Sequence, residues 1–219
     1  IALGRALKQI REDRKRARDA DNLENGTNRQ GPEFDADEKD EIQVILAHVQ
    51  NEAYLAANGD IALLPTVAEL RALYGTPDGI LTAIGVNAHH LMPEAKLARI
   101  YWLLNERHLG PDELDSMPGF LLPRYRHQGI AGTGSGFHQI EEEIEGLVRS
   151  RVGRVPPPGG GFTITEEFEI IRLTYDAMDD RFGAMDGVDY RRLRDTMINS
   201  MENAFDIDTT NGVSYLEGP

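Results

Sequence analysis

The sequence contains no cysteine among its 219 residues. This absence excludes disulfide bonds, thiolate zinc sites and cysteine nucleophiles, so any metal would be held by His, Asp, Glu or Asn side chains. Tryptophan occurs once, and we expect Trp102 and Tyr101 to belong to the core rather than to a platform for stacking bases. No run of about eighteen apolar residues is present, which predicts that no segment spans a membrane.

Positive charge is also in deficit. The chain has 37 acidic and 23 basic residues, and its formal net charge is −14. Phosphate backbones and anionic lipids repel such a chain on average, which argues against a general nucleic-acid coat protein or a membrane-surface protein. A nuclease that concentrates its few basic residues around one groove is still compatible with this charge.

The apolar pattern predicts an α+β fold that is predominantly helical, with a small ββα-metal-like core and helical flanks. Apolar residues recur at helical spacing over 37–58, 67–75, 93–110, 137–152 and in two segments beyond residue 162. Thr66 and Thr165 are expected to begin helices. A small β element is expected around 80–90 and 119–127, with a loop over 111–119.

Composition and hydrophobic pattern divide the chain into five parts. A polar leader arm covers 1–36, with a helix as one option for its first part, and a helical flank covers 37–78. The core is expected at 79–154. The segment VPPPGGG predicts a Pro/Gly linker over 155–161, and a C-terminal helical pair follows at 162–219.

The histidines are the strongest chemical signal. His89 and His90 are adjacent in NAHHLMP, and adjacent side chains of an extended segment face opposite sides. They therefore suit different tasks, with one holding a metal and its neighbour acting as a general base. His127 follows a predicted strand and His138 lies in the first turn of a predicted helix, so these two could converge on the same ion. His48 and His108 are expected to be structural.

This region resembles a known family. The chain reads AHHLMP at 88–93, then AKLARIYWLLNERHLGPDELDSMPGFLLP at 95–123, RHQG at 126–129 and GFHQIEEEIEGLV at 136–148. This order resembles the AHH nuclease-toxin family of the HNH/endonuclease VII superfamily over residues 80–152. Pro118-Gly119 stands where that family usually has Asn-Gly before its Leu-Pro.

The resemblance implies a ββα-metal fold that hydrolyses phosphodiester bonds of nucleic acid with one divalent metal ion, Mg²⁺, Mn²⁺ or Zn²⁺. Carried over residue by residue, it implies that His89 binds the metal and that His90 activates a water molecule. His138, and next His127, would complete the metal shell. The position of two arginines beside this site indicates phosphate binding by Arg124 and Arg126.

If the chain is the toxin domain of a bacterial effector, the resemblance implies an immunity protein or larger delivery complex as partner, and secretion or delivery into a target-cell cytoplasm.

Two further functional interpretations remain open. The alternative to the nuclease is a non-enzymatic, acidic helical assembly or interaction subunit, for example of a phage particle or a larger complex, which the charge balance favours. A ββα-metal fold that binds without catalysis is a third reading. The acidic run at 141–145 is expected to be a solvated face.

Overall fold

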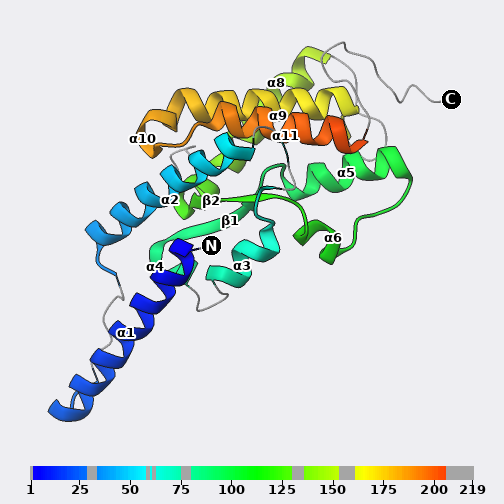
Figure 1. Cartoon of the computed structure of the whole chain (residues 1–219). Coiled ribbons are helices and arrows are strands. Elements are labelled where there is room, and N and C mark those ends of the chain that lie inside the picture. The colour runs from blue at the N-terminus through cyan, green and yellow to red at the C-terminus, as the bar shows by residue number, and fades with distance from the viewer. Residues whose placement is uncertain are drawn as a thin grey trace.

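The structure is a computed structural model, and it describes residues 2–28, 34–57, 60, 63–74, 80–129, 136–152 and 161–205. As predicted, the fold is α+β and predominantly helical. Strands β1 (Val86–His90) and β2 (Gly119–Pro123) pair in antiparallel fashion and lie between layers of helices (Figure 1). Among the described residues, no helix combines the length and the apolar character that crossing a membrane requires.

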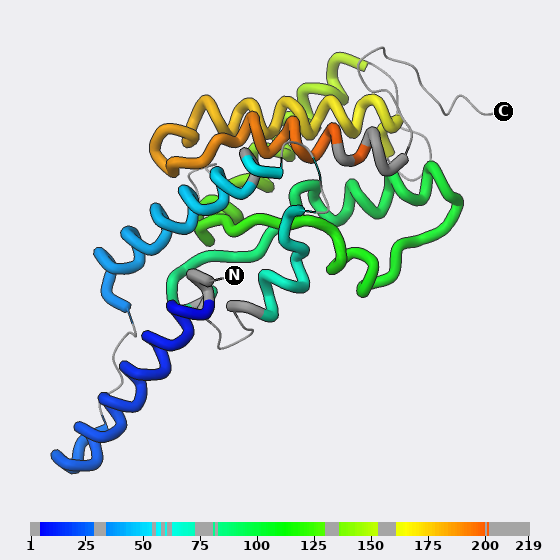
Figure 2. Tube along the Cα trace, viewed as in Figure 1, coloured from blue at the N-terminus to red at the C-terminus, as the bar shows by residue number. Residues whose placement is uncertain are grey.

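The helices surround the strand pair in chain order. Their bounds are α1 (Ala2–Asn25), α2 (Ala36–Ala57), α3 (Val67–Tyr74), α4 (Ile80–Ile84), α5 (Glu94–Asn105), α6 (Pro111–Asp115), α7 (Arg124–Gln128), α8 (Phe137–Val152), α9 (Ile164–Met178), the π-helical turn η2 (Asp179–Gly183), α10 (Ala184–Asp186) and α11 (Tyr190–Phe205). The tube in Figure 2 shows α9 and α11 running side by side above the strands.

Both predicted strand segments were too long. The first begins with helix α4, and Gly85, at φ +70°, turns the chain into β1. The second ends at Pro123, because proline has no N–H to donate to a ladder and favours the start of a helix, here α7. Each predicted strand therefore combines a short helix with a strand of five residues.

Two other boundaries differ from prediction. The expected loop over 111–119 contains helix α6, which begins at Pro111 after Gly110, and the Glu113 carboxylate accepts a hydrogen bond from the Gly110 N–H at 2.8 Å. Helix α5 ends at Asn105, earlier than expected, because Glu106 adopts a left-handed conformation with φ +53°. Residues 106–110 are not helical.

The N-termini of α3 and α9 are closed by reciprocal bonds between a threonine and a glutamate. Thr66 precedes α3 as predicted: its Oγ1 accepts from the Glu69 N–H at 3.1 Å, and the Glu69 carboxylate accepts from the Thr66 N–H. At α9 the prediction of Thr165 was wrong. Thr163 is the N-cap, and it exchanges the same two bonds with Glu166 at 3.3 and 2.7 Å.

Replacing Thr163 with alanine is expected to lower the free energy of unfolding by about 1 kcal/mol, because a backbone N–H at the start of α9 loses its acceptor. Urea denaturation followed by circular dichroism would measure this loss. Thr165→Ala is the matched control, and it should change stability by less than about 0.5 kcal/mol. Equal losses in the two variants would contradict the assignment of the cap.

Most of the described part of the leader arm forms helix α1, whereas residues 26–28 and 34–35 are not helical. Helix α1 projects from the body, with its first turns against the rest of the chain (Figure 1). Leu7 is buried near its start, whereas Leu23 is 87% exposed near its end. Residues 29–33 of the arm and 153–160, which hold most of the predicted linker, lie outside the described residues.

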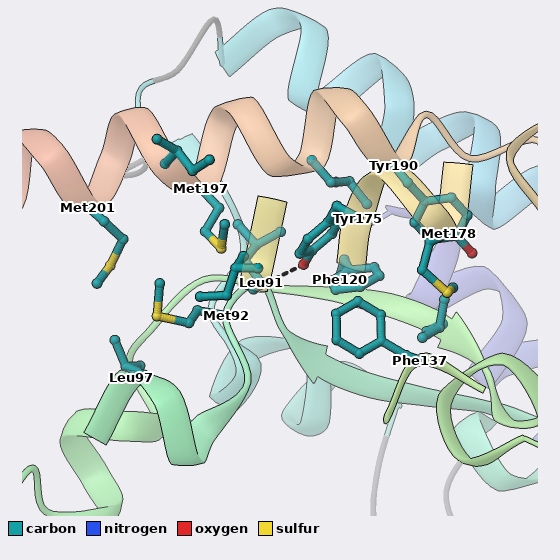
Figure 3. Packing of buried hydrophobic residues seen from close by; sticks show 14 of the residues in the cluster. Leu91, Met92, Leu97, Phe120, Phe137, Tyr175, Met178, Tyr190, Met197 and Met201 are labelled. Carbon is teal, nitrogen blue, oxygen red and sulfur yellow. Dashed lines mark hydrogen bonds between the residues drawn. The ribbon is translucent and has the colours of Figure 1, made fainter. Parts of the chain in front are cut away.

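The strand pair separates two hydrophobic clusters. Phe120 and Leu122 face the larger one, which includes residues of α5, α8, α9 and α11 (Figure 3). Leu121 and Val86 face the other, built with α1, α2, α3 and α4. The C-terminal helices thus pack onto the predicted core region, and the Tyr175 hydroxyl donates a hydrogen bond to the Leu91 carbonyl (Figure 3).

Trp102 is not a core residue, contrary to expectation, since 45% of it is exposed.

Candidate metal centre

Strand β1 separates the two adjacent histidines as the alternation rule predicts. His89 lies opposite Phe120 in the register, and its ring contacts the Phe120 ring at 5.3 Å between centroids. His90 lies opposite Gly119 and donates its Nε2–H to the Leu114 carbonyl at 3.1 Å. Both residues are buried, yet each meets a different set of neighbours.

Three histidines from separate elements come together. His89 of β1, His127 of α7 and His138 of α8 each place one ligand nitrogen within 4.8 Å of the others. The Nε2 atoms of His127 and His138 are 3.1 Å apart. The ring of His89 lies 4.8 Å from that of His127 and 5.5 Å from that of His138. The structure therefore groups the three histidines that the sequence proposed as ligands.

The second nitrogen of each ring has its own partner. His89 Nδ1 bonds to the His90 carbonyl, His127 Nδ1 meets the Asn87 carboxamide at 2.8 Å, and His138 Nδ1 bonds to the Glu141 carboxylate at 3.2 Å. A histidine that ligates a metal typically donates its other ring N–H to such an outer partner, which fixes its tautomer and orientation. This pattern leaves three Nε2 atoms for one ion.

In the structure the Asn87 Nδ2 faces His127 Nδ1 at 2.8 Å. Rotating the carboxamide by half a turn would let Oδ1 accept from the His127 Nδ1–H, which is the arrangement that a metal bound at Nε2 requires. Asn87 precedes His89 by two residues and so lies on the same face of β1. That spacing was the signal in the sequence that could have identified it.

The donor set fits a transition-metal ion. Imidazole nitrogens bound at about 2.0–2.1 Å to one tetrahedral zinc ion lie about 3.3 Å apart, close to the 3.1 Å between His127 and His138. Three neutral nitrogens suit Zn²⁺ and its neighbours in the series, whereas Mg²⁺ prefers oxygen ligands. Three protein ligands also leave a position open, which is the arrangement of a catalytic site.

Burial favours the neutral imidazoles of His89, His90 and His127. It lowers the pKa of His127 to about 4, helped by the nearby charge of His138, and it lowers the pKa of His89 well below the usual value. Burial also lowers the pKa of His90, against the opposing effect of its hydrogen bond to Leu114. At neutral pH the ring nitrogens therefore have lone pairs for a metal or a proton.

One cavity is lined both by the three clustered histidines and by His90. It has a volume of about 820 Å³, and its walls include His89, His90, His127 and His138. Its charged lining consists of Arg71, Lys96, Glu94, Glu141, Glu142 and Glu145. A ligand in this cavity can therefore meet the three clustered histidines and His90 together.

Part of the acidic run is not solvated as expected. Lys96 of α5, whose side chain is 6% exposed, pairs with Glu167 at 3.0 Å, with Glu141 at 3.7 Å and with Glu145. Glu141 thereby contacts both Lys96 and His138. Nothing in the spacing of Lys96 and Glu167 along the chain indicates this cluster, which forms only when α5, α8 and α9 pack.

The two arginines proposed for phosphate binding lie elsewhere. Arg126 is buried, its Nε bonds both carboxylate oxygens of Asp186, and its guanidinium lies 3.6 Å from the centroid of the Phe182 ring. Arg124 is exposed and lines a different cavity, beside Lys39 and Tyr125. Neither arginine lines the cavity of the histidines.

No protein-family model, curated protein or solved structure matches this chain. The assignment of the site therefore depends on the residues and their geometry.

Proposed function

We propose that the chain is a metal-dependent endonuclease of the AHH type that hydrolyses phosphodiester bonds, and that it serves as the toxin domain of a bacterial effector. The convergence of one ring nitrogen from each of three histidines, beside a separate buried histidine in one cavity, supports this proposal most strongly. His89, His127 and His138 would hold the ion. An immunity protein or delivery complex would be its partner.

The three clustered histidines and His90 have separate tasks in this proposal. A divalent ion held by the three imidazoles would supply Lewis-acid stabilisation of the phosphate oxygens. His90 accepts the proton of the attacking water at Nδ1, because its Nε2–H is engaged by Leu114. Water then adds to phosphorus, the bond from phosphorus to the leaving oxygen breaks, and that oxygen takes up a proton from solvent.

A nuclease assay tests this function. We expect the chain, stripped with chelator and reloaded with Zn²⁺, Mn²⁺ or Mg²⁺, to cleave DNA or RNA only in the presence of metal, with Zn²⁺ bound most tightly. His90→Ala should lower the cleavage rate by at least about 100-fold while metal binding is retained. The control is His108→Ala, since His108 is exposed and outside the cluster.

Failure of the metal-loaded parent to cleave any DNA or RNA, single- or double-stranded, would rule out the nuclease. If such a chain still bound metal, the reading as a ββα-metal fold without catalysis would replace it.

The second candidate is an acidic assembly or interaction subunit. The projecting helix α1 favours it, because its side chains are exposed over most of its length (Figure 1). Loss of metal binding and cleavage together would make this candidate the better account.

A further inference from the structure

The cavity of the candidate metal centre needs a cation for a phosphodiester, because its lining is acidic overall. Four of its charged residues are glutamates and two are cations, Arg71 and Lys96. A nucleic-acid phosphate is negative, so the ion alone would have to offset both the substrate charge and this lining. The question is which of the two cations can reach a substrate.

Lys96 is already engaged. Its side chain is 6% exposed, and three carboxylates surround its ammonium group. If Lys96 moved toward a phosphate, Glu167 would lose an ion pair. The side chain of Glu167 is only 3% exposed, so its buried negative charge would then be less well compensated. Lys96 therefore holds α5, α8 and α9 together rather than contacting substrate.

Arg71 differs from Lys96 in exposure and in partner. Its side chain is 41% exposed, and a single guanidinium nitrogen, Nη1, pairs with Asp115 at 2.5 Å. Asp115 is 40% exposed, and exposed pairs of this kind contribute only about 0–1 kcal/mol. A guanidinium also carries further N–H donors, arranged in a fork that matches the oxygens of a phosphate.

Arg71 lies on the His90 side of the strands. His90, Ala88 and Gly119 share the face of the strand pair on which α3 packs, and His90 bonds to Leu114, the neighbour of Asp115.

Gly119 lets α3 approach closely enough for this placement. A Cβ atom at Gly119 would lie 2.6 Å from Val67 Cγ2 and 2.9 Å from the backbone oxygen of His89. The Val67 N–H also donates to the Met117 carbonyl at 2.9 Å, and Gly119 N–H to that of Pro65 at 2.9 Å. Helix α3, and Arg71 with it, is thus held against β2 at Gly119, the residue that pairs with His90 of β1.

We propose that Arg71 is the residue that binds the substrate phosphate at this site, in place of Arg124 or Arg126. The inference rests on the nuclease function proposed above. Binding of the phosphate by the guanidinium places a phosphodiester between Arg71, His90 and the three clustered histidines. Without substrate, Asp115 orients the Arg71 guanidinium. When the phosphate binds, it replaces Asp115 or binds to the guanidinium beside it.

Steady-state cleavage of labelled DNA and RNA hairpins tests the proposal. We expect Arg71→Ala to raise KM by about tenfold, the usual cost of a lost charge-assisted hydrogen bond, with a smaller change in kcat. Arg71→Lys should recover part of the loss. The slope of log affinity against log salt concentration should fall by about one. The hairpin that the parent cleaves shows whether DNA or RNA is the source of the phosphate.

Arg107→Ala is the matched control, because Arg107 is a comparably exposed arginine that pairs with an exposed carboxylate, Glu113, outside the cavity. A KM for Arg71→Ala within about twofold of both parent and control would overturn the proposal while leaving the nuclease intact.

If the parent does not cleave, fluorescence anisotropy of the same hairpins with the zinc-loaded chain decides the matter. Weaker binding by Arg71→Ala than by Arg107→Ala supports the phosphate contact without catalysis, whereas equal binding, or none by the parent, overturns it.

Discussion

Replacing His138 with alanine is expected to weaken Zn²⁺ binding by more than about 100-fold, beyond the 10–100-fold cost of losing an outer-sphere partner. The reason is that only His89 and His127 would remain in the proposed shell. The side chain of His138 is 49% exposed, so its removal takes little from the core. Competition with a chromophoric chelator would measure the affinity, and circular dichroism would show that the fold is retained.

His48→Ala is the control for this experiment, since His48 is an exposed histidine of α2 outside the cluster. It should bind Zn²⁺ as the parent does. Zinc at about 100 times its dissociation constant should also stabilise the parent by about 2.7 kcal/mol, and His138→Ala should lose that gain. Parent-like zinc affinity in His138→Ala would refute the three-histidine site.

Local rules were enough to predict that the side chains of the two adjacent histidines face opposite sides. Alternation along a strand requires His89 and His90 to face opposite sides, and the structure places them so. The grouping of His89 with His127 and His138 followed from a resemblance and from spacing, and the structure brings these three rings together.

The ion-pair partners of Arg126 and Lys96 could not be predicted from the sequence. Arg126 is neutralised by Asp186, which is 60 positions away, and Lys96 by Glu167, which is 71 positions away. Such partners meet only after the helices have packed, and composition gives no sign of them. Because Arg126 is next to His127 in the sequence, it was predicted to bind phosphate. In the structure its guanidinium instead forms an ion pair with Asp186, outside the cavity of the histidines.

Short elements were the other source of error. Helices α4, α6 and α7 each have five residues, too few for an apolar period to distinguish helix from strand. The long helices α2 and α8 had enough turns to show their stripe, and their bounds agree with prediction within about two residues.

The candidate metal centre and the main core share an aromatic boundary. The ring of His89 packs against Phe137 at 4.8 Å and against Phe120 at 5.3 Å, and Tyr175 contacts both phenylalanines. This packing restricts the rotation of His89, and its burial keeps the imidazole neutral. Substitutions in this boundary should therefore affect stability and metal binding together.

Phe120→Ala should show this coupling most clearly. We expect the free energy of unfolding to fall by about 3–5 kcal/mol, because the fully buried ring leaves a cavity between β2 and α9. The total stability of a domain is about 5–15 kcal/mol, so the variant should unfold at much lower urea concentration. Zinc affinity should also fall, since His89 loses one wall of its pocket.

Two variants separate this effect from a general sensitivity to lost apolar surface. Leu147→Ala removes a side chain of α8 that is 63% exposed, and it should change stability by less than about 0.5 kcal/mol. Phe120→Leu keeps most of the apolar volume and should lose less stability and less zinc affinity than Phe120→Ala. If Phe120→Ala cost no more than Leu147→Ala, the Phe120 ring would not be part of a close-packed boundary, and Phe137 and the backbone hydrogen bond would have to orient His89 without it.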